Sequence, residues 1–134
     1  MTHLLDTNAI SDLMRAAPRV ENWIAGLDGG RSHRDMSDTK GEVLFGISRL
    51  PAGRRRTELE QTGRQFLAAF HCQSVPEQSG DLYAAVKLMR HQRGLALDEN
   101  DLWIAATAPV LGATLVSRDG DFAGIQGLSV LALV

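Results

Sequence analysis

Cysteine is almost absent from this chain of 134 residues, because Cys72 is the only one. A single cysteine excludes an internal disulfide and fits a reducing cytosol, and we interpret it as a small core or helix-end residue. No run approaches the roughly 18 apolar residues that would cross a bilayer. The first residues, 1–6, also lack the basic and then apolar order of a secretory signal. We therefore expect a cytoplasmic protein with no membrane contact.

Several motifs of enzyme chemistry are missing as well. The histidines show no metal-ligand spacing, and most of them are interpreted as surface residues: His3, His33, His71 and His91. The chain has no Gly-x-Ser-x-Gly, no phosphate-binding glycine loop and no paired cysteines. With these motifs missing, the carboxylates are the side chains whose positions indicate a candidate catalytic site.

Lysine is scarce, with only Lys40 and Lys87, and the formal charge is −2. A negative chain argues weakly against nucleic-acid binding. Arginine supplies the other positive charges and suits bidentate phosphate contact, although a genomic bias toward arginine explains its excess at least as well. The run at 54–56 is interpreted as a solvated helix start, with phosphate contact as the alternative.

Apolar patterning predicts a single α/β domain over residues 1–134. Hydrophobic residues make up 44% of the chain, which is enough for a core. Short apolar runs predict strands at 3–5, 73–75, 113–116 and 128–131. Helical spacing predicts a helix capped by Thr7 or Asn8 and further helices after Pro18, near Thr39, at Thr57, over 76–93 and at 98–101. Strands separated by helices favour a parallel sheet with helices on both faces.

Residues 31–38 do not fit this pattern well. An α/β fold needs a second strand here, yet the segment is polar, which predicts an edge strand or an irregular one. Two sequences further along match the helix-capping box, in which Ser or Thr precedes Glu by three residues. They are Thr39 with Glu42 and Thr57 with Glu60.

Four acidic residues each lie where one apolar segment ends and another begins: Asp6, Glu42, Asp101 and Asp119. Ligand sites in open α/β sheets lie at the carboxyl ends of strands. Like charges gathered there repel and favour a cation between them. Each acid also has an ordinary explanation, namely a turn residue, a helix cap or a favourable place in a first helical turn. Their shared placement is what indicates a metal-dependent hydrolase with a phosphodiester substrate.

Four blocks in this chain resemble the PIN-domain family, in particular the VapC-type toxins of type II toxin–antitoxin systems. Leu4-Leu5-Asp6-Thr7-Asn8 resembles its opening, and Glu42 with Val43 and Gly46 its second acid. Residues 101–107, Asp-Leu-Trp-Ile-Ala-Ala-Thr, resemble its most recognisable block, and residues 115–122 its closing block. The polar segment 31–38 departs from the family, which has an apolar strand there.

The resemblance implies a three-layer α/β/α sandwich around a parallel sheet of four to five strands. It also implies an Mg²⁺- or Mn²⁺-dependent endoribonuclease with an acidic cluster at Asp6, Glu42, Asp101 and Asp119. Thr7 and Asn8 match supporting polar positions, and Asp121 matches an auxiliary acid. The implied partners are an RNA substrate, a cognate antitoxin and a second copy of the chain in a homodimer.

Two other functions stay open at this point. The first is a non-catalytic PIN-like binding module that acts through a protein partner or operator DNA, which the polar second strand favours. The second is a phosphoacceptor domain of the receiver type, which also gathers acids at strand ends. A receiver needs a lysine after a late strand, and neither lysine of this chain lies there.

Overall fold

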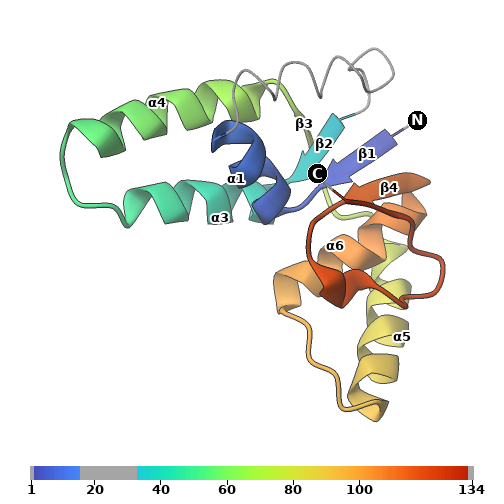
Figure 1. Cartoon of the computed structure of the whole chain (residues 1–134). Coiled ribbons are helices and arrows are strands. Elements are labelled where there is room, and N and C mark those ends of the chain that lie inside the picture. Colours follow the sequence, from blue (N-terminus) through green and yellow to red (C-terminus); the bar gives the residue numbers. More distant parts are fainter. Residues whose placement is uncertain (1, 16–32, 133–134) are drawn as a thin grey trace.

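Five parallel strands form the centre of the computed structural model, which describes residues 2–15 and 33–132 (Figure 1). Their order across the sheet is β3-β2-β1-β4-β5. The strands are β1 (Thr2–Leu5), β2 (His33–Met36), β3 (His71–Gln73), β4 (Ala113–Val116) and β5 (Val130–Leu131). All neighbours pair in parallel, as expected for strands joined through helices.

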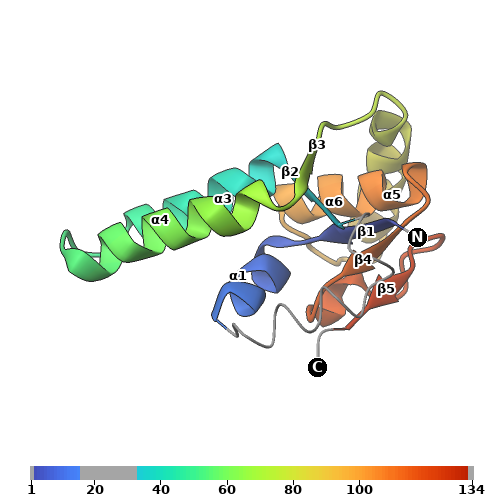
Figure 2. The same ribbon diagram turned by 90° about the horizontal axis from the view of Figure 1, so that it is seen from above.

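Helices cover both faces of this sheet. On one side lie α1 (Thr7–Arg15), α3 (Ser37–Ser48) and α4 (Arg54–Ala68); on the other lie α5 (Ser79–Gln92) and α6 (Glu99–Val110). Figures 1 and 2 show α3 and α4 side by side as a hairpin that extends beyond the sheet. The expected three-layer α/β/α architecture is therefore confirmed.

Alternating side chains on the central strands build the two cores. Leu4 and Leu115 belong to the core under α5 and α6, whereas Leu5 and Val116 belong to the core under α1, α3 and α4. All four are fully buried. Successive residues of a strand point to opposite faces, so a strand covered on both sides is apolar at consecutive positions. This explains why β1 and β4 were readable as continuous apolar runs.

The second strand was predicted as an edge or irregular strand, and that prediction is wrong. β2 is regular and lies inside the sheet, between β1 and β3. It places Asp35 in the interior at 1% exposure, with no hydrogen bond to either carboxylate oxygen among the described residues. Burial raises the pKa of this carboxyl to about 6. The prediction relied on the polar composition of residues 31–38. β2 is a regular strand nevertheless, because β1 and β3 pair with it on its two sides.

Both predicted capping boxes are also wrong. α3 begins at Ser37 directly after the extended residue Met36, so Thr39 lies inside the helix and is fully buried. α4 begins at Arg54, and the Thr57 hydroxyl donates within the helix to the Gly53 carbonyl at 3.1 Å. α3 thus starts two residues before Thr39, and α4 starts three residues before Thr57.

Smaller differences concern single elements. β3 lies two residues before its predicted place, and β5 is half its predicted length. Cys72 is exposed on β3 rather than in a core, and His3 is buried, whereas His71 and His91 are exposed as predicted. The helix predicted after Pro18 lies outside the described residues. Among the helices of residues 2–15 and 33–132, none is long and apolar enough to span a bilayer.

Candidate metal and phosphodiester site

The carboxyl ends of β1 and β4 meet at one edge of the sheet. Leu5 pairs with Val116 at the last step of the two strands, and the Asp6 amide donates to the Val116 carbonyl at 3.3 Å. Asp6 and Ser117 therefore leave the sheet side by side. In α/β sheets with helices on both faces, ligand sites lie at the carboxyl ends of neighbouring central strands.

Asp6 is held by two hydrogen bonds and is only 2% exposed. Its Oδ1 accepts from the Ala9 amide at 2.7 Å, and its Oδ2 accepts from the Ser117 hydroxyl at 2.5 Å. Asp6 thus caps α1, a role that the sequence had predicted for Thr7 or Asn8. The cap fixes the carboxylate at a helix N-terminus, where the helix dipole favours its negative charge.

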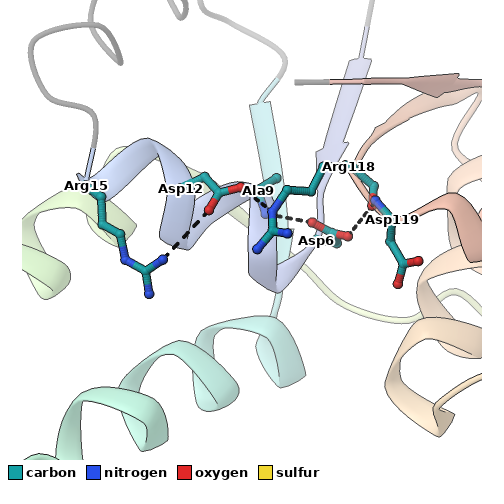
Figure 3. A network of polar contacts seen from close by, with 7 residues as sticks. Asp6, Ala9, Asp12, Arg15, Arg118 and Asp119 are labelled. Atoms are coloured by element: carbon teal, nitrogen blue, oxygen red, sulfur yellow. Dashed lines mark hydrogen bonds and ion pairs between the residues drawn. The ribbon is translucent and has the colours of Figure 1, made fainter. Parts of the chain in front are cut away.

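Ser117 continues this network from Asp6 to Asp119, two residues that Figure 3 labels. Its Oγ accepts from the Asp119 amide at 3.0 Å, and Asp119 Oδ1 in turn accepts from the Asp121 amide at 2.9 Å. Sequence reasoning had missed Ser117. The available signal was its place directly after a buried strand and two residues before an acid. It ties the loop after β4 to Asp6.

Glu42 reaches the same region from α3. Its Oε2 accepts from the Thr7 hydroxyl at 2.7 Å, so the first residue of α1 orients the second predicted acid. Glu42 has no capping role, because α3 starts five residues earlier. Asn8 is exposed and makes no side-chain hydrogen bond within the described residues. Thr7 and Glu42 also line one groove of about 880 Å³ between α1, α3 and α4.

Asp101 lies in the first turn of α6 and is electrostatically coupled to the other acids. Burial is the largest cause that raises its pKa to about 6, followed by the negative charges of its neighbours Asp6, Asp98, Asp119 and Glu42. The pKa of Asp6 is also raised, chiefly by burial, and Asp119 adds to that effect. Asp101 therefore lies within electrostatic range of the three other predicted acids, and Asp6 within range of Asp119.

Arg90 of α5 holds the loop that carries Asp119 and Asp121 through a hydrogen bond. Arg90 is 6% exposed and donates to the Asp121 carbonyl and the Ala96 carbonyl, each at 3.1 Å. Asp121 is exposed and takes part through its backbone groups. Sequence reasoning had missed Arg90, because nothing in a helical pattern distinguishes a buried arginine from a solvated one.

The donor set suits a hard divalent cation. Carboxylate oxygens are the ligands that Mg²⁺ and Mn²⁺ prefer, and the mutual repulsion around Asp101 is what a cation would relieve. No three His, Cys, Asp or Glu side chains in the described part of the chain are already arranged to hold an ion. The acids thus gather negative charge around Asp101 without forming a coordination shell.

Comparison with known proteins extends over almost the whole chain. The family model described as PIN domain matches residues 3–128. The plasmid stability protein StbB of Pseudomonas syringae pv. tomato is 30% identical over 96% of this chain and 95% of its own length. The VapC ribonuclease Y4jK of Sinorhizobium fredii is 29% identical over 96% and 94%, respectively.

Similarity to solved structures concerns the same fold. The crystal structure of VapBC2 from Rickettsia felis, bound to a DNA fragment from its promoter, superposes with a TM-score of 0.86. It is 22% identical, and the match covers 98% of each chain. The fold, the matched range and the 30% identical relative agree with the resemblance predicted from the four sequence blocks. The chain belongs to the PIN-domain family.

Proposed function

We propose that this chain is a metal-dependent endoribonuclease and the toxin of a toxin–antitoxin pair. The observation that carries the proposal is the crowding of Asp6, Glu42 and Asp119 around Asp101 at the carboxyl end of the sheet. A similar protein of nearly equal length is a VapC ribonuclease, which supports RNA as the substrate class.

Asp6 and Asp101 are the residues that would hold Mg²⁺ or Mn²⁺ directly, and Glu42 and Asp119 would complete the site. When bound, such an ion activates water and stabilises the charge that develops on a phosphate during in-line displacement. The chain's own hydrogen bonds prepare for this. Ser117 fixes Asp6, and the Thr7 hydroxyl holds the Glu42 carboxylate. Both carboxylates are thereby oriented before a substrate arrives.

The proposed protein partner is inferred from solved structures of similar proteins and not from contacts of this chain. The Rickettsia felis structure is a VapBC2 complex on promoter DNA, which supports a cognate antitoxin as the partner. We also propose a homodimer, a cytoplasmic location and no membrane contact, in line with the short apolar runs of the sequence.

The direct test is cleavage of labelled single-stranded RNA by the purified chain, freed of any antitoxin. We expect fragments in Mg²⁺ or Mn²⁺ and none with excess EDTA, because the carboxylates alone cannot activate water. Re-addition of Mg²⁺ after EDTA should restore cleavage. Equal cleavage in EDTA would contradict the proposal, as would intact RNA under all metal conditions.

One observation favours a second function, a non-catalytic binding module. Within residues 2–15 and 33–132 the acids are not already arranged as an ion shell. A module of this kind would bind RNA, DNA or a protein partner without cleaving it. Calorimetry that detects no Mg²⁺ or Mn²⁺ binding would support this function over the nuclease.

A further inference from the structure

Arg118 stands beside the acidic cluster and is not used by the chemistry described so far. It lies between Ser117 and Asp119, so both of its chain neighbours belong to the hydrogen-bonded network around Asp6. Figure 3 shows it reaching from the loop after β4 to Asp12 on α1, next to Asp6.

The contact with Asp12 orients Arg118 without enclosing it. Arg118 Nε donates to Asp12 Oδ2 at 2.6 Å, and the Arg118 side chain is 55% exposed. Among the described residues its two terminal nitrogens have no protein partner. A guanidinium has five N–H donors in a fixed fork, so four remain for a ligand.

Asp12 also attracts a second arginine. Arg15 lies 3.9 Å from Asp12 Oδ1, and it lines the same groove as Thr7 and Glu42. Arg118 and Arg15 carry two positive charges and Asp12 carries one negative charge. This group therefore has a net charge of +1 on the α1 side of the acidic cluster. In a chain with a formal charge of −2, this local positive charge can attract a polyanion to that site.

We propose that Arg118, oriented by Asp12, binds a phosphate of the RNA strand next to the bond that is cut. The inference rests on the proposed nuclease function and adds a substrate-binding residue to it. A bidentate contact from the free edge of the guanidinium matches the geometry of a phosphate. It would place the strand across the end of β4, where Asp6 and Asp119 lie.

The test measures binding of a labelled single-stranded oligoribonucleotide by fluorescence anisotropy, with EDTA present so that metal-dependent cleavage is off. We expect Arg118→Gln to weaken binding about tenfold at low salt, the effect of losing one charged hydrogen-bonding group. The slope of log affinity against log salt should fall by about 0.7, the value for one phosphate on a single strand. Arg118→Lys should recover the slope and only part of the affinity.

Two further variants separate RNA contact from a purely structural role. Arg54→Gln removes the same charge from an exposed arginine that is likewise paired with an acid, Glu58 at 2.9 Å, and should leave the slope unchanged. Asp12→Asn removes the negative charge but keeps an amide oxygen that can accept from Arg118 Nε and orient it, so it should bind RNA at least as tightly as the unmodified chain. Equal losses in Asp12→Asn and Arg118→Gln would overturn the proposal.

Failure of this inference is distinguishable from failure of the proposed function. A chain that cleaves RNA in Mg²⁺ while Arg118→Gln binds like Arg54→Gln refutes the role of Arg118 alone. The same result is expected if Arg118 contacts a protein partner instead of RNA. Absence of any RNA binding refutes the inference, and absence of cleavage in metal separately refutes the nuclease.

Discussion

Replacement of Asp6 by asparagine is expected to lower metal-dependent RNA cleavage by at least about a thousandfold, because a metal ligand contributes several kcal/mol to such chemistry. Asparagine has nearly the same shape and retains an oxygen that can accept from the Ala9 amide, so α1 keeps its cap. The lost features are the negative charge that an ion requires and the oxygen that accepts from the Ser117 hydroxyl. Initial cleavage rates in saturating Mg²⁺ measure the effect.

The matched control is Asp81→Asn, the same change at an exposed acid in the first turn of α5. It should cleave like the unmodified chain. Circular dichroism and thermal unfolding should show that Asp6→Asn folds as well as the control does. Undiminished cleavage by folded Asp6→Asn would remove Asp6 from the site and, with it, the proposed mechanism.

Asp101→Asn is expected to abolish RNA cleavage and to raise the free energy of unfolding at neutral pH. Its pKa of about 6 lies above the ordinary value of 3.8, so the ionised form favours unfolding. The penalty is absent well below pH 3.8, where the group is protonated in both states. It grows between the two pKa values and is complete above pH 6. The shift corresponds to about 3 kcal/mol at most, and partial exposure reduces our expectation to about 1–2 kcal/mol.

Urea unfolding in EDTA at pH 4 and pH 7.5 tests this sign. The unmodified chain should lose stability relative to Asp101→Asn as the pH rises, and cleavage by the variant should be abolished. Asp38→Asn, an exposed acid in the first turn of α3, is the control and should show neither effect. Addition of Mg²⁺ should stabilise the unmodified chain and not Asp101→Asn. A variant less stable than the unmodified chain at pH 7.5 in EDTA would contradict the crowding of charges.

Strands with apolar side chains on both faces were predictable from the sequence. β1 and β4 each bury consecutive apolar residues, and their helices on either side followed from the 3.6-residue period. Asp6 and Asp119 could therefore be placed at one edge of the sheet. Asp101 followed from the largely buried helix whose first turn it occupies, since such a helix must start near the sheet.

Other parts depend on contacts between distant residues, and no local pattern carried them. β2 is a strand because β1 and β3 pair with it on both sides, although Asp35 is a poor residue for an interior position. Glu42 looked like a helix cap, yet its partner is Thr7, 35 residues away. Ser117 and Asp6 are 111 residues apart, and their hydrogen bond exists only because β1 and β4 are neighbours.

The central claim is that Asp6, Glu42, Asp101 and Asp119 supply one cation site. The most direct test is a crystal structure grown with Mn²⁺ and measured for anomalous scattering. We expect a manganese peak with Asp6 and Asp101 among its ligands, and we expect that peak to disappear in Asp101→Asn. A fully occupied ion elsewhere, or no ion between these carboxylates at saturating Mn²⁺, would contradict the account.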